Sequence, residues 1–177
     1  MLSLRDLTYT EIATRIILSV LFGGILGMER GMKNRGAGLR TYMLVCLGSC
    51  VVMMTNQFLY QSYQSGDPAR LGAQVINGIG FLGAGTILVT GRQQVKGLTT
   101  AAGLWASACT GLAVGAGFYE CVLIAFAMIF LSIRLFPIVD AYIQENARDI
   151  NLYMEFYSLG DISTIINQLK SQNVQIY

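Results

Sequence analysis

Residues 67–105, DPARLGAQVINGIGFLGAGTILVTGRQQVKGLTTAAGLW, decide how the rest of the chain is interpreted. From Leu71 to Gly91 this stretch carries no charge, but glycines and two amides, Gln74 and Asn77, interrupt it. A simple membrane anchor is rich in leucine and poor in glycine. The pattern therefore predicts a backbone that approaches another backbone closely, with amides in an apolar setting.

The composition of the whole chain indicates a membrane protein. Hydrophobic residues make up 54%, charged residues 12%, and the mean hydropathy is +0.54, whereas a soluble domain carries about 25% charge. Charge-free runs of roughly 20 residues are long enough to cross a hydrocarbon core of about 30 Å. We expect an all-α polytopic membrane domain, and we identify no cleaved signal peptide.

Several functional classes are disfavoured by the same inventory. The net charge of +2 with no clustered basic face argues against nucleic-acid binding. The absence of histidine excludes imidazole-based metal sites and catalysis, and no nucleophile–base pair is evident. We therefore expect that the protein is not an enzyme and that it has no catalytic residue and no cofactor. The sequence does not indicate whether it binds a metal ion. Four cysteines, none in a C-x-x-C pair, are expected to be buried structural thiols.

The apolar runs predict five transmembrane helices within residues 1–140, at about 12–28, 41–60, 69–90, 98–114 and 121–139. Thr8 and Glu11 have the spacing of a capping box at the start of the first helix. Arg15 lies four residues after Glu11, so the two can pair, and we expect Arg15 to snorkel to the interface. Pro137 predicts a kink.

The loop charges orient these helices. Basic residues gather in the loops after the first and third spans, and the positive-inside rule places those loops in the cytoplasm. They are Arg30, Lys33, Arg35, Arg40, Arg92 and Lys96. This predicts a bacterial inner-membrane protein with its N-terminus outside and its C-terminus in the cytoplasm.

The composition changes after Asp140. Residues 141–149 are interpreted as a helical extension or a linker, and 150–177 as a strand, a helix and the start of a second strand. Such a short β-α-β fragment cannot bury a core by itself. We expect it either to pair with another copy or to be the beginning of a longer α/β domain, and we favour the second.

The glycines of the central stretch have two interpretations. Residues 78–83 match G-x-G-x-x-G, but a dinucleotide site needs a preceding strand and a later acidic residue, so that function is rejected. Close helix packing or contact with a partner remains, as does a broken helix that meets a polar ligand. The candidate packing residues are Gly78, Gly80, Gly83, Gly85, Gly111, Gly115 and Trp105. Gly23 and Gly27 form a similar G-x-x-x-G pair.

Ionisable and polar residues near the membrane form the candidate functional cluster. We expect Glu29 to pair with Arg40 beside the hydroxyls of Thr99 and Thr100. An acidic residue inside a basic loop does not contribute to the orientation of the helices in the membrane, so a specific pairing is the better explanation of Glu29. On the other side, a polar stripe leads from Asp67 into the third span, and helix contact and solute passage both fit it. The full set is Glu29, Arg30, Arg40, Thr41, Asp67, Arg70, Gln74, Asn77, Thr99 and Thr100.

Three long segments together resemble the MgtC/SapB family of bacterial inner-membrane proteins. They are ERGMKNRGAGLRT at 29–41, DPARLGAQVINGIGFLGAGTIL at 67–88 and VKGLTTAAGLWASACTGLAVGAGFY at 95–119. The resemblance implies five transmembrane helices followed by a cytoplasmic ACT-like domain, of which 150–177 would be the start. The chain departs from the family pattern at Gly72, Asn77 and Gly103, where Ala, Ser and Thr are usual.

The resemblance also implies a function. It points to a non-enzymatic regulator linked to magnesium limitation and virulence. The best-known member of the family restrains the proton-translocating ATP synthase through membrane contacts, and the resemblance carries this role over as a class. We expect a homodimer in contact with membrane lipid. The alternative is a small transporter or channel for an ion or solute, using the polar stripe of the third span.

Overall fold

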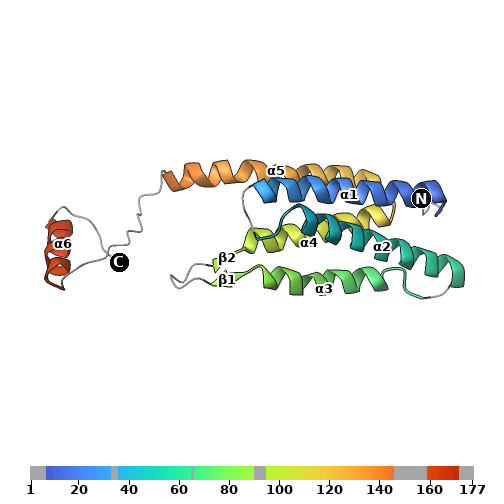
Figure 1. Ribbon diagram of the computed structural model, residues 1–177, viewed down its shortest axis with the longest axis horizontal. Helices are drawn as coiled ribbons and strands as arrows, with labels where there is room; N and C mark the ends of the chain where they lie inside the picture. The colour runs from blue at the N-terminus through green and yellow to red at the C-terminus, as the bar shows by residue number, and fades with distance from the viewer. Residues whose placement is uncertain (1–6, 33–35, 65, 90–94, 146–158, 172–177) are drawn as a thin grey trace. The chain divides into compact units, whose positions relative to one another are not determined.

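The computed structural model describes residues 7–32, 36–64, 66–89, 95–145 and 159–171. Figure 1 shows the elements, which are α1 (Tyr9–Met32), α2 (Leu39–Tyr63), α3 (Arg70–Gly85), β1 (Leu88–Val89), β2 (Val95–Lys96), α4 (Leu98–Gly115), α5 (Tyr119–Glu145) and α6 (Leu159–Ser171). The chain divides into two compact units, Met1–Ile138 and Val139–Tyr177. In the first unit successive helices run in opposite directions (Figure 1).

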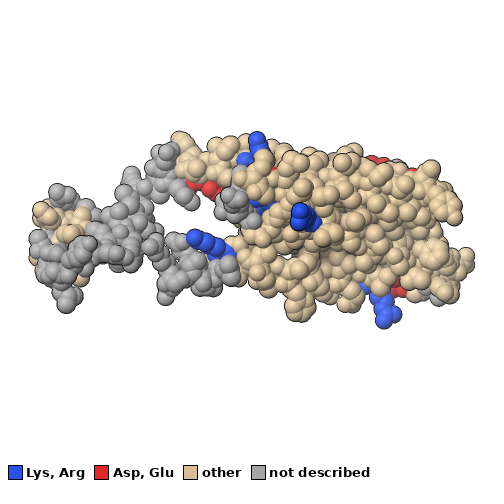
Figure 2. Space-filling model, in the orientation of Figure 1, with Lys and Arg blue, Asp and Glu red and all other residues tan. Residues whose placement is uncertain are grey.

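Four of the described helices are long and apolar enough to cross a membrane. They are Tyr9–Met32, Leu39–Tyr63, Leu98–Gly115 and Tyr119–Ile143. Figure 2 shows a broad uncharged surface over the bundle, and much of the blue on this face lies over the half nearer to β1 and β2. We call that end of the first unit, where α1 ends and α2 and α4 begin, the basic end, and the opposite end the far end.

The third predicted span is shorter than expected. The sequence predicted a helix over 69–90, but α3 ends at Gly85, where the Thr86 amide donates to the Gly83 carbonyl at 3.0 Å. The chain then forms a hairpin in which Leu88 pairs with Lys96. Sixteen helical residues extend about 24 Å, less than the roughly 30 Å of a hydrocarbon core. A fifth full span is therefore not confirmed.

The backbone of α2 lies directly against glycines of α1 and α4. A Cβ atom built on Gly23 would stand 2.8 Å from the Tyr42 carbonyl oxygen, and one on Gly27 would stand 2.7 Å from the Leu39 Cα. On α4, a Cβ on Gly111 would overlap the Cys46 carbonyl oxygen. Small residues allow this approach of helices, and any larger side chain would force them apart.

The cysteines differ in their surroundings. Cys46 and Cys50 are buried in the packing of α2, and Cys109 is half-buried. Cys121 is exposed, so the expectation of four buried thiols was wrong for this residue. Its neighbour Val122 is buried, because α5 presents only one narrow stripe to the bundle. The Phe126 ring continues that stripe against Phe22, with ring centroids 4.6 Å apart.

The last two described helices lie in the C-terminal region. α5 continues through Pro137 to Glu145, and the rest of the predicted extension or linker, 146–149, lies outside the described residues. α6 covers the predicted helix of the second unit. The two expected strands fall in 146–158 and 172–177, outside the described residues. The ACT-like domain therefore stays a prediction.

A substitution at Gly97 tests the described turn from the β1–β2 hairpin into α4. Its φ is +100°, and a Cβ there would overlap the Thr86 carbonyl oxygen. We expect Gly97→Ala to lower the free energy of unfolding in detergent by more than about 1 kcal/mol. Gly85→Ala is the control, because nothing lies within 4 Å of its added Cβ. Equal thermal stability of the two variants would contradict the described turn.

Candidate functional site

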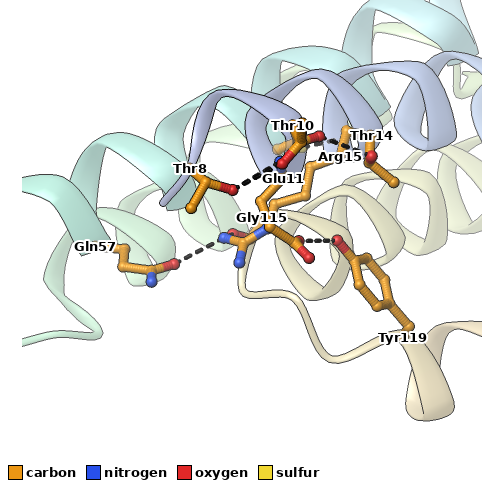
Figure 3. Close-up of polar contacts among 9 residues, drawn as sticks. Thr8, Thr10, Glu11, Thr14, Arg15, Gln57, Gly115 and Tyr119 are labelled. Carbon is orange, nitrogen blue, oxygen red and sulfur yellow. Dashed lines mark hydrogen bonds and ion pairs between the residues drawn. The ribbon is translucent and has the colours of Figure 1, made fainter. Parts of the chain in front are cut away.

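Arg15 is the centre of a buried polar cluster at the far end (Figure 3). Its side chain has no exposed surface. Its Nη1 atom donates to Gln57 Oε1 and to the Gly115 carbonyl oxygen, both at 2.8 Å. Its Nε atom lies 3.6 Å from Glu11 Oε2, which also accepts a 2.7 Å hydrogen bond from the Tyr119 hydroxyl. These residues, the Arg15 cluster, join α1, α2, α4 and α5.

Local structure explains why Arg15 points inward. The Glu11 amide donates to Thr8 Oγ1 at 3.3 Å, so α1 begins early and Arg15 lies well inside the helix. At the end of α4, free backbone carbonyls offer a partner for a cation. Gly117 leaves the necessary room, since its Cβ would stand 2.7 Å from Arg15 Nη2. The expectation that Arg15 snorkels to the interface was wrong, although its predicted pairing with Glu11 is confirmed.

A second buried cluster, the Arg30 cluster, lies at the basic end. Arg30 Nη2 donates to Thr100 Oγ1 at 2.7 Å. The Tyr42 hydroxyl donates to the Thr100 backbone carbonyl at 3.3 Å. All three residues are buried. The ends of α1, α2 and α4 are therefore held together by a cation, a phenol and one threonine.

Glu29 is paired differently from the expectation. Its Oε2 atom lies 2.9 Å from Arg134 Nη1 of α5. The Glu29 side chain is 3% exposed and that of Arg134 is 60% exposed. Arg40 is exposed on α2, and the structure does not bring it to Glu29. Thr99 is likewise exposed, and Thr41 is half-buried.

The predicted polar stripe of α3 lies on the outside of the chain. Asp67 caps the region before the helix by accepting a 2.8 Å hydrogen bond from the Ala69 amide. Arg70, Gln74 and Asn77 follow at helical spacing, and all are exposed. Phe81, one turn further, is 86% exposed. We call Arg70, Gln74, Asn77 and Phe81 the outer face of α3.

The candidate packing glycines fall into two groups. Gly83 faces α4, with its Cβ position 3.5 Å from Ala101, and Gly111 and Gly115 contact α2. In contrast, Gly78, Gly80 and Gly85 have no atom within 4 Å of an added Cβ. Trp105 is half-exposed, one turn beyond Ala101. Intramolecular packing thus accounts for some of these glycines and leaves three open.

Sequence reasoning missed Gln57, Tyr42 and Arg134. Gln57 and Tyr42 fall in the predicted second span, where polar groups are rare and usually have a specific partner. That signal was available for Gln57, but nothing in the sequence indicates which helix supplies the partner. Among the described residues, no three His, Cys, Asp or Glu side chains gather where they could hold a metal ion.

We expect the Glu29–Arg134 pair to be energetically coupled. Glu29→Gln and Arg134→Gln should be non-additive in unfolding free energy by at least about 0.5 kcal/mol, because each removes the same contact. Glu29→Gln and Arg40→Gln should be additive, which makes Arg40 the matched control. Denaturation in detergent measures both cycles. Additivity in the first cycle would contradict the described pair.

Comparison with known proteins gives one family and several relatives. Residues 16–142 match the model of the MgtC family. An uncharacterized protein of Haemophilus influenzae is 35% identical over 178 residues, covering 93% of this chain and 75% of that protein. Protein SapB of Bacillus subtilis is 31% identical over 175 residues, covering 94% and 75%. No solved structure matches significantly.

A further relative carries a function in its name. The "Putative magnesium transporter YhiD" of Escherichia coli K12 is 40% identical over 131 residues, covering 71% of this chain and 60% of that protein. These matches thus span 60% to 75% of the length of the three relatives. Together with the four apolar helices, they identify a multi-pass membrane protein.

Proposed function

This chain belongs to the MgtC family, and from that premise we propose that it is a non-enzymatic regulator that acts by helix contacts within the membrane. Its activity is linked to magnesium, in keeping with the name of the Escherichia coli relative. The partner we propose is a membrane protein of energy conversion, with the proton-translocating ATP synthase as the candidate. The membrane is the bacterial inner membrane, and the basic end and the C-terminus lie in the cytoplasm.

The proposal rests on the outer face of α3. Gln74 and Asn77 are exposed on α3, the helix that follows α2 and precedes α4 in the chain. Nearby, Gly80 and Gly85 have no side chain to cover the backbone, and nothing packs against them. An amide facing hydrocarbon lacks hydrogen-bond partners, whereas another helix can supply them. Open glycines let a second backbone approach closely enough to do so. This face is suited to contact with another membrane protein.

The interior supports regulation over transport by a single chain. In the middle of the bundle, buried hydroxyls already bond to backbone carbonyls, as in Ser49 to Val45 at 2.8 Å and Ser107 to Tyr42 at 3.1 Å. Each of these two hydroxyls has used its one donor within the fold, while its oxygen keeps its lone pairs. The glycine contacts of α2 also close the space between the helices.

A small transporter remains the second candidate, favoured by the polar stripe of α3. Because Arg70, Gln74 and Asn77 face outward, a path along them would need a second wall, supplied by another copy or another protein. The two candidates differ in a direct way. A transporter moves a solute in liposomes by itself, and a regulator does not.

The test combines liposomes with native membranes. We expect no saturable flux of Mg²⁺, protons or phosphate in liposomes holding the purified protein. In inverted vesicles from magnesium-limited cells, the protein should lower ATP-driven proton pumping at least about twofold. Asn77→Leu should abolish this effect, while Ser132→Leu should not, since the exposed Ser132 hydroxyl is already bonded to its own helix. Saturable flux that is lost in Asn77→Ala would overturn the regulator and establish the transporter.

We also propose that two copies associate through the outer face of α3. Gly80→Leu should reduce dimer cross-linking in membranes several-fold, because it fills an open approach surface. Gly31→Leu is the control, a roomy exposed glycine of α1. Gly83 is unsuitable for this test because it packs against Ala101 in its own chain. Equal cross-linking of the two leucine variants would place the dimer contact elsewhere.

A further inference from the structure

We propose that the groove between α2 and α3 is a binding site for one anionic phospholipid. The groove has a volume of about 550 Å³. Arg40 and Thr41 stand at its basic end, and the rest of its lining is apolar or glycine apart from Ser49. The occupant must therefore carry a negative charge at one end and hydrocarbon along the rest, which is the pattern of an anionic phospholipid.

The hydrocarbon part of the groove is formed by missing side chains. Gly48 of α2 and Gly78 of α3 face it, and nothing lies within 4 Å of a Cβ added to either. From Arg40 to Ser49 the α2 wall extends about 13 Å along the helix, at 1.5 Å per residue. The Ser49 hydroxyl is already bonded to the Val45 carbonyl at 2.8 Å, so it presents no unmet polar demand. An acyl chain fits this hollow without leaving a buried polar group unpaired.

The headgroup end offers a cation and backbone amides. Arg40 is exposed, and within the described part of the chain no carboxylate pairs with it. It is the second residue of α2, a helix of 25 residues whose N-cap, Gly38, provides no side-chain cap. The first-turn amides of such a helix favour an anion. A phosphate can therefore contact Arg40, the Thr41 hydroxyl and the helix end together.

Comparison with a second groove supports an anionic lipid as the occupant of the α2–α3 groove. The groove between α1 and α2 at the far end is larger, about 710 Å³, and is lined by residues such as Leu7, Ile12 and Phe58. It carries no charged lining residue among those described. Any acyl chain fits there, so it has no reason to prefer an anionic headgroup. Of these two grooves, the α2–α3 groove is the one that combines hydrocarbon shape with a cation.

Native mass spectrometry tests this site. The purified full chain is mixed with equal amounts of phosphatidylglycerol and phosphatidylcholine and released from detergent. We expect one phosphatidylglycerol to be retained in preference, and Arg40→Gln to lower that preference about fivefold, the effect of one basic residue near an anionic surface. Arg70→Gln, an exposed arginine outside this groove, should leave it unchanged. Equal retention of both lipids, or equal effects of the two variants, would overturn the proposal.

A pair of glycine variants tests the groove itself. Gly78→Leu should remove the bound lipid, whereas Gly80→Leu, two residues away but outside the groove, should keep it. Thermal unfolding of both variants controls for damage to the fold. If Gly78→Leu instead dissociates a dimer in the same spectra, a second copy occupies the groove and the lipid assignment is overturned. Displacement of phosphatidylglycerol by millimolar inorganic phosphate would equally overturn it, in favour of a soluble anion.

Discussion

The contact of the α2 backbone with glycines on both of its neighbours is the constraint on which the rest of the structure depends. Gly23 and Gly27 on one side, and Gly111 and Gly115 on the other, bring helix axes closer than any larger residue permits. In a membrane this packing has no hydrophobic drive, so it depends on dispersion contacts and on polar bonds between helices. The polar bonds require the same closeness. Arg15 reaches the Gly115 carbonyl only because the helices are in near contact at that level.

The two buried clusters lie at opposite ends of this packing and stabilise it in the same way. A buried cation is costly unless it is paired and hydrogen-bonded, so each arginine favours the arrangement of helices in which its hydrogen bonds form. Arg15 donates to α2 and α4, and Arg30 donates to α4. A sliding or rotation of α4 would break both sets at once. The bundle of α1, α2 and α4 is thus specified at its two ends and close-packed between them.

Much of this fold was predictable from the sequence, for identifiable reasons. Runs of apolar residues have to lie in hydrocarbon, so four helices appeared at nearly their predicted positions. The direction of a side chain was less predictable, because Arg15 near the end of an apolar run fits both an interface and a core. Its partners, Gln57 and Gly115, lie on other helices, and their proximity depends on helix order in three dimensions. The same holds for Arg134, which is 105 residues from Glu29.

Gly103 illustrates how a departure from the family pattern acquires a physical reason. The sequence marked it as a position where threonine is usual and offered no explanation. In the structure a Cβ at Gly103 would overlap the Tyr42 hydroxyl, so the glycine makes room for the phenol that bonds to Thr100. A tyrosine at 42 and a glycine at 103 therefore depend on each other. Threonine at 103 would push the Tyr42 hydroxyl away from its bond to the Thr100 carbonyl.

α3 is the element that this packing leaves incomplete. It contacts α4 through Gly83 and Ala101, yet it keeps open glycines and two exposed amides, and it ends before the length of a full span. The helices that carry the buried arginines are instead joined to one another by hydrogen bonds on their inner faces. The stability of a short helix with polar groups toward lipid depends on what lies beside it. Whatever covers that face, a lipid on one flank or a protein on the other, therefore acts on a helix that the buried arginines do not hold in place.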